Sequence, residues 1–291
     1  MLFNIWKFKS YVLVSVVFFL VMKEFVFVTS RTDKASSNMA HTLVSKFGFT
    51  KSGEIIKGNP VWKNGCLKLI MVDSDMIMLE GLDKNFSPHA YVFLSKHQSE
   101  SGIPALTAHF PGNFSQENIY GGSPKELAVT YPSFHKDYIQ RLWEERDRVP
   151  GFRIVTEPTH HGPTSHFRPV IFIELGSSEK EWSNMNAAEV ICEVLLNTID
   201  KLQEASKICI ALGGPHYSEK FTSLLFESEY AIGAIAPKYS LHNLDSVMFK
   251  QMIERCVEKV EYVVIDWKGL GKEKERILAL VEEAKLSIVK V

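Results

Sequence analysis

The sequence predicts an α/β protein that forms a single three-layer α/β/α domain around a mostly parallel, mixed sheet. Short β-rich segments alternate with segments whose apolar residues recur at helical spacing, which is typical of a sheet covered by helices. Most β-rich segments are continuous apolar runs, as strands buried on both faces require. The 291 residues are 45% hydrophobic, with no shift of composition between two halves. This composition excludes a disordered chain, because it can bury a sizeable core.

Nine strands are predicted from runs that are rich in apolar and β-branched residues. Some are short, and each is bounded by glycine, proline or polar residues that end a strand. In chain order the expected strands are Glu24–Thr29, Leu67–Val72, Tyr91–Leu94, Ala105–His109, Phe152–Glu157, Val170–Leu175, Ile208–Leu212, Ala231–Ala236 and Tyr262–Asp266.

Five helices are predicted between these strands from apolar residues at helical spacing. In the fourth of them, Val247, Met252, Ile253, Cys256 and Val260 lie close to an i, i+3, i+4, i+7 stripe. The expected helices are Ser37–Phe47, Ser133–Arg146, Ala187–Ala205, Ser246–Val260 and Lys272–Ala284. No internal repeat or low-complexity linker interrupts this alternation, so we expect one domain over residues 22–291.

Residues 1–21 form an apolar extension ahead of this domain. The run Tyr11–Met22 follows Lys7 and Lys9, but it is shorter than the roughly 20 residues that a membrane-spanning helix needs. A signal-like segment, cleaved or anchoring, is one interpretation. The absence of a small-x-small cleavage site favours another, in which Met22 is the physiological start. A further N-terminal element is the third alternative.

The charge and cysteine content set limits on partners and compartment. The formal net charge is -1, so a nucleic-acid partner would have to meet a local basic patch. Four scattered cysteines form no C-x-x-C pair, which indicates reduced thiols in a cytoplasmic protein.

Polar loops that follow four predicted strands carry the candidate chemistry. Gly and Pro accompany a histidine in three of these loops, and the strand Val170–Leu175 carries a carboxylate near its end. The candidates are His109, His160, His161, Glu174 and His216. Because the carboxyl ends of parallel strands share one edge of a sheet, we expect these residues to meet at one rim.

Imidazoles and a carboxylate at one rim favour a hydrolytic metal site. Zinc takes three nitrogen or oxygen ligands and leaves a position for water, whose pKa falls to about 7. Adjacent His160 and His161 would point to opposite faces of an extended chain, so both can serve one site only if the loop turns at Gly162-Pro163. Metal-free catalysis by the same residues and histidines that only order their loops remain alternatives.

Several other chemistries lack their motifs. The sequence contains no G-x-S-x-G, no G-x-x-x-x-G-K-[ST], no G-x-G-x-x-G and no H-E-x-x-H. These absences disfavour a serine hydrolase of the α/β type, a P-loop NTPase, a dinucleotide enzyme and a zincin.

Further polar residues are weaker candidates near the same rim. Asn113 could polarise a carbonyl as an oxyanion donor, and Thr164 is either a catalytic hydroxyl or a turn residue. The glycines and lysines that could meet phosphate groups are Gly121, Gly122, Lys125, Lys220 and Lys238.

Taken together, the loops resemble those of the archaeal and plant type of D-aminoacyl-tRNA deacylase. Each motif alone would be weak, but they occur in the family's order from about Met22 to the C-terminus. They are Leu106-Thr-Ala-His-Phe-Pro-Gly-Asn113, Tyr120-Gly-Gly-Ser-Pro-Lys-Glu-Leu127, Glu157-Pro-Thr-His-His-Gly-Pro-Thr164, Phe172-Ile-Glu-Leu-Gly-Ser-Ser-Glu-Lys-Glu-Trp182, Gly213-Gly-Pro-His-Tyr217 and Ala236-Pro-Lys-Tyr239. The N-terminal extension departs from the family pattern, and this favours Met22 as the start.

The resemblance implies a phosphorylase/hydrolase-like fold and dependence on Zn²⁺, with one ion or more. It also implies hydrolysis of the ester that joins a D-amino acid to the terminal adenosine of tRNA, as quality control of mischarged tRNA. The partner would be the 3′ end of aminoacylated tRNA, met by a cytoplasmic monomer with no protein or membrane partner. Residues 22–291 would then be the catalytic domain.

Roles at the site are inferred from clustering. We expect metal ligands among His109, His160, His161, Glu174 and His216, with Glu174 also a candidate base. Catalytic roles are expected for Glu174, His161, Asn113 and Thr164, and the L-aminoacyl group should be rejected by the shape of the pocket. The alternatives are a zinc peptidase or amidohydrolase, a non-catalytic protein that binds RNA ends, and a nucleoside phosphorylase.

Overall fold

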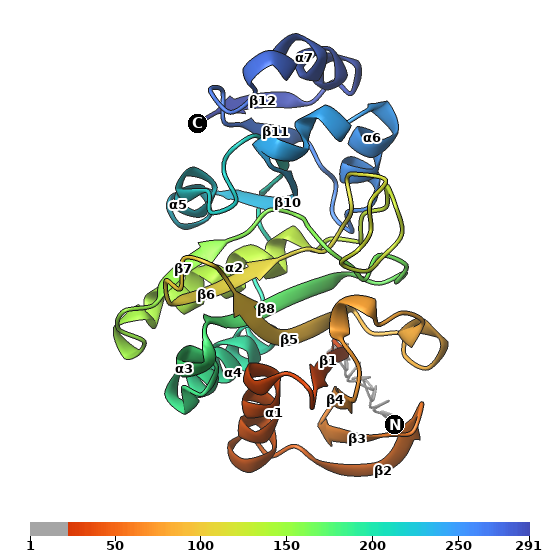
Figure 1. Ribbon diagram of the computed structural model, residues 1–291, viewed down its shortest axis with the longest axis vertical. Coiled ribbons are helices and arrows are strands. Elements are labelled where there is room, and N and C mark those ends of the chain that lie inside the picture. Colours follow the sequence, from red (N-terminus) through yellow and green to blue (C-terminus); the bar gives the residue numbers. More distant parts are fainter. Residues whose placement is uncertain (1–22) are drawn as a thin grey trace, which may run out of the picture.

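A computed structural model describes residues 23–291, which form two sheets with helices packed against them (Figure 1). The expectations for residues 1–21 lie outside the described residues. None of the helices within residues 23–291 has both the length and the hydrophobicity that a membrane-spanning helix needs. The predicted α/β class with a mixed, mostly parallel sheet is confirmed.

The larger sheet has eight strands and places a parallel centre between antiparallel flanks. β1 pairs in parallel with β4 and β5, and β5 pairs in parallel with β8. β6 runs antiparallel to β8 and parallel to β7, and β2 and β3 form an antiparallel edge on β4. The strands in spatial order are β2 (Thr50–Ile56), β3 (Asn59–Asn64), β4 (Leu67–Val72), β1 (Phe25–Ser30), β5 (Ala90–Gln98), β8 (Val170–Ser177), β6 (Ala105–His109) and β7 (Arg153–Thr156).

The smaller sheet has four strands, and every pairing in it is parallel. Its strands in spatial order are β10 (Tyr230–Ala236), β9 (Lys207–Leu212), β11 (Tyr262–Ile265) and β12 (Ser287–Lys290). The single sheet implied by the sequence prediction is therefore divided in two.

The helices begin where a side chain caps their first turn. Asp33, Asn184, Ser218 and Asp245 each accept a hydrogen bond from a backbone N–H of the first turn, and Pro132 occupies the first turn of another helix. The helices are α1 (Lys34–Lys46), α2 (Pro132–Glu144), α3 (Glu179–Trp182), α4 (Met185–Asp200), α5 (Glu219–Glu227), α6 (Ser246–Glu254) and α7 (Lys274–Glu283). Short 3₁₀ segments include η1 (Met76–Met78), η2 (Leu82–Lys84), η3 (Arg146–Arg148), η4 (Lys238–Asn243) and η5 (Gly271–Glu273).

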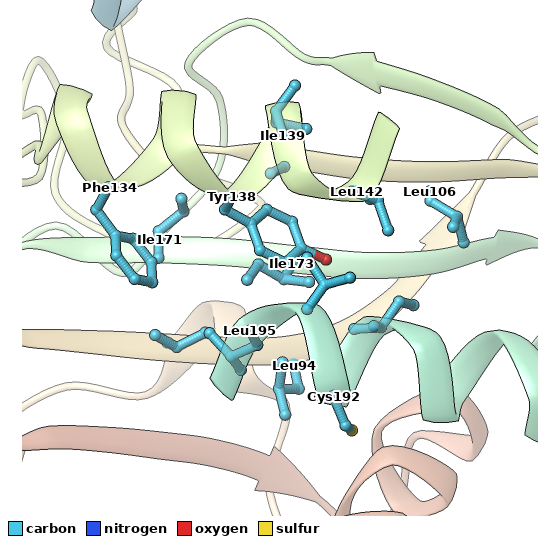
Figure 2. Close-up of a cluster of buried hydrophobic side chains, with 14 of the residues drawn as sticks. Leu94, Leu106, Phe134, Tyr138, Ile139, Leu142, Ile171, Ile173, Cys192 and Leu195 are labelled. Atoms are coloured by element: carbon cyan, nitrogen blue, oxygen red, sulfur yellow. The ribbon is translucent and has the colours of Figure 1, made fainter. Parts of the chain in front are cut away.

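One hydrophobic core joins the two sheets through α2. Tyr138 and Leu142 of α2 and Leu195 of α4 lie around Ile171 and Ile173 of β8 (Figure 2). The same core continues into the smaller sheet through residues of β9, β10 and β11. The large sheet therefore has α1, α2 and α4 on this face.

The opposite face of the large sheet is covered mainly by η1, η2 and loops. Met76, Leu82 and Phe86 pack there against Val28 and Phe93. Because loops rather than helices cover the remainder of this face, it has room for cavities.

The sequence locates most of the buried elements but misses the exposed ones. All nine predicted strands and all five predicted helices have counterparts, although α4 ends at Asp200 and α6 at Glu254, earlier than expected. β2, β3 and β12 are missed because their residues are largely polar or exposed, whereas α5 is missed although it is as long as α6, which was predicted.

The expectation that all the candidate loops share one rim is wrong. β6 and β7 run opposite to β8, so the carboxyl ends of these strands lie at opposite edges of the sheet. The physical reason is the connection between β5 and β6, residues 99–104, which is too short for the crossover that a parallel return requires.

Candidate functional site

Polar side chains gather on one face of the large sheet where β5, β8 and β6 lie side by side. Ser95 and Thr107 each stand opposite Glu174 in the strand register, and His109 stands opposite Phe172. Alternate residues of a strand share a face, so His97 joins this set. All five polar residues are less than 9% exposed, which makes this a buried polar surface beneath the loops.

Two loops bring further imidazoles over this surface. His160 and His161 follow β7, and His216 follows β9. The ring of His109 stacks on the ring of His160 with centroids 4.3 Å apart, and the rings of His160 and His216 are 5.1 Å apart. The four histidines selected from the sequence are thus brought together, although they come from both sheets.

The loop after β7 turns as the paired histidines require. His161 has a positive φ of 46°, and its carbonyl accepts a hydrogen bond from Gly112 N–H at 2.7 Å. A Cβ at Gly162 would lie 2.2 Å from the backbone nitrogen of Gly122, so only glycine fits this close approach of two loops. The turn lets both rings serve one site.

Backbone carbonyls orient the two rings. His160 Nδ1 donates a hydrogen bond to Pro158 O at 2.7 Å, and His161 Nδ1 donates one to Gly162 O at 2.6 Å. In a neutral ring with Nδ1 protonated, Nε2 carries a lone pair. Both Nε2 atoms therefore act as acceptors at the site.

Burial keeps these rings neutral at pH 7. Desolvation, reinforced by neighbouring imidazoles, lowers the pKa of His160 and of His161 to about 4. Burial also holds the pKa of His109 well below its ordinary value, again with a contribution from His160 and His161. Neutral imidazole is the form that binds metal ions.

Glu157 is the carboxylate closest to the imidazoles, and the sequence analysis did not select it. Its Oε2 lies 3.3 Å from His216 Nε2 and 3.5 Å from His160 Nε2. Burial would raise the pKa of Glu157, but hydrogen bonds from His216 and His97 hold it well below its usual range. Its position directly after a buried strand, at the start of the motif that contains both histidines, was the available signal.

His97 connects Glu157 to Glu174, and it too was missed. His97 Nδ1 lies 2.9 Å from Glu157 Oε1 and 3.3 Å from Glu174 Oε2. Burial opposes protonation of His97, but the two carboxylates outweigh it and raise the pKa to about 11. On the other side of the ring, Nε2 lies 2.9 Å from the hydroxyl of Tyr217. His97 is therefore protonated, and it lies between the carboxylates of Glu157 and Glu174.

Glu174 lies below the imidazole cluster, in the sheet itself. It accepts hydrogen bonds from the Ser95 hydroxyl at 2.7 Å and from the Thr107 hydroxyl at 3.2 Å. Glu174 contacts His97, and His97 in turn contacts Glu157, which lies next to the imidazole cluster. Its expected role as a metal ligand or base stays a prediction.

Asn113 and Thr164 both support the loop 121–127. The amide nitrogen of Asn113 donates hydrogen bonds to Gly121 O at 2.7 Å and to Ser123 O at 3.1 Å. The Thr164 hydroxyl donates one to Glu126 Oε2 at 2.7 Å and accepts one from Ser123 N–H at 2.8 Å. Both hydrogens of the Asn113 amide are thus engaged, which leaves none for an oxyanion in this arrangement.

The candidates for phosphate binding are dispersed. Lys125 pairs with Asp245 at 2.6 Å and Lys220 pairs with Asp266 at 2.7 Å, whereas Lys238 is exposed beside Tyr239. Gly121 and Gly122 both have positive φ, and a Cβ at Gly121 would lie 2.0 Å from Ile77 O. These glycines allow two loops to pack closely, and their role in tRNA binding stays a prediction.

Two cavities meet at the imidazole cluster. Cavity 1 has a volume of about 730 Å³ and extends over Glu157, Glu174 and His216 toward Asp33 and Asp75. Cavity 2 has a volume of about 570 Å³ and lies between the loop 112–120 and η4. The residues that line both cavities are Tyr120, His160, His161 and Tyr239.

Three groups of donor atoms are close enough to share a metal ion. They are His109 with His160 and His161, Glu157 with His160 and His216, and His97 with Glu157 and Glu174. The first two groups share His160 and open onto the cavities. A set of buried and half-buried imidazoles and carboxylates at the meeting point of two cavities is suited to metal-assisted hydrolysis.

Residues 84–289 match the model of the family described as D-aminoacyl-tRNA deacylase. The chain belongs to this family. The resemblance found from the loop motifs is thereby confirmed.

Archaeal members of the family match most of the chain. The D-aminoacyl-tRNA deacylase of Cenarchaeum symbiosum (strain A) is 39% identical over 257 residues, which cover 88% of this chain and 96% of that protein. That of Pyrococcus horikoshii is 36% identical and covers 91% of this chain and 99% of that protein. A crystal structure of a conserved protein of unknown function superposes with a TM-score of 0.86 at 26% identity, over 92% of this chain and 95% of that one.

Proposed function

We propose that the protein hydrolyses the ester bond between a D-amino acid and the terminal adenosine of tRNA, which releases free tRNA and the D-amino acid. Membership of the deacylase family supports the reaction class. The observation that carries the proposal for this chain is the convergence of four imidazoles and Glu157 where two cavities meet. We propose that the protein acts on tRNA as a cytoplasmic monomer.

We further propose that the imidazole cluster binds zinc. His109 Nε2 and His161 Nε2 lie 3.1 Å apart, and His160 Nε2 faces Glu157 Oε2 at 3.5 Å. His160 and His161 each donate Nδ1–H to a carbonyl, so their Nε2 lone pairs point into the cluster, where that of His160 faces a carboxylate oxygen of Glu157 and that of His161 faces His109 Nε2. Neutral imidazoles with a carboxylate are the donor set that zinc prefers.

The donor atoms suggest which residues would hold the metal. His109, His160 and His161 form one set, and Glu157, His160 and His216 form the other. Because His160 has only its Nε2 lone pair free, it would bind one ion, and a second ion would be held by the remaining residues of the other set. Zinc bound there would supply a Lewis acid for the ester carbonyl and would lower the pKa of water to about 7. The carbonyls of Pro158 and Gly162 keep the ligand rings oriented, as outer partners of metal-binding histidines do.

The surrounding residues would orient the cluster and handle the proton. Glu157 is the carboxylate within reach of the reacting centre, and His97 fixes its orientation. We assign Glu174 to positioning, because it holds His97 while Ser95 and Thr107 hold Glu174. Asn113 and Thr164 are likewise assigned to positioning, since they hold the loop 121–127.

A chelation experiment tests the function and the metal together. We expect purified protein to release D-Tyr from D-Tyr-tRNA, to lose this activity with a chelator and to regain it with added zinc. Metal analysis of the untreated protein would give the number of ions per chain.

The same assay separates the rival functions. A zinc peptidase or amidohydrolase would turn over peptides without tRNA, and a protein that only binds RNA ends would contain no metal and release no amino acid. Either result would contradict the proposal.

Selection against L-aminoacyl groups would arise from the shape of cavity 1. An L-amino acid places its side chain where the D-isomer has hydrogen, so a close wall near the ester excludes it. We expect D-Tyr and D-Asp to be released from tRNA and L-Tyr to be retained. Rapid release of L-Tyr would contradict selection by shape.

A further inference from the structure

The two cavities that meet at His160 and His161 have walls of different chemistry. Cavity 1 is lined by four carboxylates, which belong to Asp33, Asp75, Glu157 and Glu174. Cavity 2 is lined by one carboxylate, that of Glu117, together with amide and hydroxyl side chains. Lys96 and protonated His97 also line cavity 1 and offset part of this charge, but its carboxylates remain in excess. Cavity 1 is therefore the better suited of the two to a cationic group, and cavity 2 has fewer carboxylates to repel a group that carries phosphate.

The polar groups of cavity 2 are partly free to bind a ligand. The side chains of Gln116, Ser240 and Asn243 line the cavity and make no hydrogen bond to any residue within the described range 23–291. By contrast, the amide nitrogens of Asn113 and Asn118 donate hydrogen bonds to backbone carbonyls of the loop. Free amide groups can read the hydrogen-bonding edge of adenine, which presents one donor next to one acceptor.

Exposed aromatic and apolar side chains line cavity 2 or lie in the segment next to it. Tyr120 and Tyr239 line both cavities and are 65% and 53% exposed. Ile119 and Met78 are 70% and 54% exposed, and the close approach of Gly121 to Ile77 O places their segments side by side. Exposed aromatic rings next to free amide groups are typical of surfaces that bind unpaired nucleotides by stacking.

Cavity 1 offers a carboxylate to an ammonium group. Asp33 uses both carboxylate oxygens, because Oδ1 accepts from Ser36 N–H at 3.0 Å and Oδ2 accepts from Lys96 N–H at 2.8 Å. Asp75 is exposed, and its Oδ1 accepts from Ile77 N–H at 3.2 Å. Its Oδ2 makes no hydrogen bond within residues 23–291, so it can receive a charged donor from a ligand.

We propose that cavity 2 binds the terminal adenosine of tRNA, with Tyr120 stacked on a base, and that cavity 1 binds the D-aminoacyl group, with its α-ammonium at Asp75. This inference rests on the proposed function. The ester bond has to lie at His160 and His161, where the cavities meet, so the two halves of the substrate extend to opposite sides. Placing the nucleotide in cavity 1 instead would bring its phosphate to a wall where four carboxylates outnumber the two cations, Lys96 and His97.

Binding of AMP to the chelator-treated protein tests the nucleotide half without any contribution from metal or turnover. We expect Tyr120→Ala to weaken AMP binding about tenfold in calorimetry, since stacking on an aromatic side chain is lost. Tyr120→Phe keeps the ring and is expected to bind AMP as the unaltered protein does. Asp75→Asn, which preserves the bond to Ile77 N–H, is expected to leave AMP binding unchanged.

Deacylation assays test the aminoacyl half. We expect Asp75→Asn to raise KM for D-Tyr-tRNA about fivefold and to leave KM for N-acetyl-D-Tyr-tRNA unchanged, because the acetylated substrate has no ammonium group. An equal change for both substrates would contradict the contact with Asp75.

The AMP results separate this inference from the proposed function. AMP binding that is weakened by Asp75→Asn but not by Tyr120→Ala would reverse the assignment of the cavities, and no measurable binding of AMP would also overturn it. Deacylation of D-Tyr-tRNA by the unaltered protein with no effect of Tyr120→Ala on AMP would refute the cavity assignment alone. Tight AMP binding without deacylase activity would refute the proposed function alone.

Discussion

Alternate residues of the buried strand β8 form its two faces, and one face packs in the core while the other faces the imidazole cluster. Ile171, Ile173 and Leu175 point into the core beneath α2 and α4. Between them, Phe172 and Glu174 point toward the imidazoles. Every residue of β8 is buried, so exposure does not distinguish the two faces. In β8 a single carboxylate, that of Glu174, marks the functional face, and alternate polar residues of the neighbouring strands, Ser95 with His97 and Thr107 with His109, extend it.

The largest expected effect comes from removing a ligand on the polar face. We expect His161→Ala to lower kcat/KM for D-Tyr-tRNA by about 10³-fold, because loss of a metal ligand removes several kcal/mol of transition-state stabilisation. The thermal unfolding midpoint should change little, since the ring contributes little to the apolar core. His41→Ala, at an exposed position on α1, is the control and should leave turnover unchanged. Unchanged turnover in His161→Ala would remove the site assignment.

A substitution on the apolar face should lower stability and leave turnover unchanged. Ile173 is fully buried in the core, so we expect Ile173→Ala to lower the free energy of unfolding by about 2–5 kcal/mol. Denaturant titration measures this change, and the folded fraction should keep the kcat of the unaltered protein. A large loss of kcat with little loss of stability would mean that the two faces are not independent.

A positioning residue of the polar face should give an intermediate effect on activity. We expect Glu174→Gln to lower turnover by roughly 10- to 100-fold, as for outer partners of metal ligands. The variant keeps the shape of the side chain but loses the charge that, with Glu157, keeps His97 protonated. Metal affinity should fall with turnover if Glu174 acts through His97. Turnover lost at unchanged metal affinity would instead indicate a direct catalytic role.

The smallest expected effect, for a change of one pH unit, is a pH dependence that comes from the apolar side of the sheet. His135 of α2 is buried and contacts Ile232 O at 3.3 Å and the Thr156 hydroxyl at 3.1 Å, and burial lowers its pKa to about 4. Below its ordinary pKa of 6.5, the unfolded chain binds a proton that the folded chain does not bind until about pH 4. Its contribution to stability is therefore lost as pH falls between these values, by about 1.4 kcal/mol per pH unit.

Comparison with His135→Gln isolates this effect from that of the other buried histidines. Denaturant titrations of both proteins between pH 7 and pH 5 should give a shallower slope for the variant. Equal slopes would show that His135 does not titrate differently in the folded and unfolded states.

The sequence was sufficient for the strands and helices of the core, and for the four histidines. Continuous apolar runs such as Val170–Leu175 leave little choice of structure, and histidines beside glycine and proline at strand ends stand out. It did not reveal the reversed direction of β6, although the short connection after β5 required it. The expectation of one common rim was wrong because that short connection was not taken into account.

Glu157 and His97 were missed for a different physical reason. Their importance lies in contacts across the fold, since His97 comes from β5 and meets carboxylates that follow or lie within β7 and β8. His97 stands in a strand without glycine or proline beside it, so local sequence gave no sign of it, whereas Glu157 could have been noticed only from its place at the start of the motif with both histidines. Glu174 was recognised as unusual within an apolar strand, but its neighbours could not be read from the chain.

The carbonyls that orient His160 and His161 belong to the backbone, and this affects how the site can change during evolution. An orienting carboxylate from a side chain can be lost in one substitution, whereas the carbonyls of Pro158 and Gly162 persist whatever side chains surround them. Only a change in the path of the loop would release the rings. The cavity walls can therefore diversify among descendants to accept different substrates while the reacting centre is inherited intact.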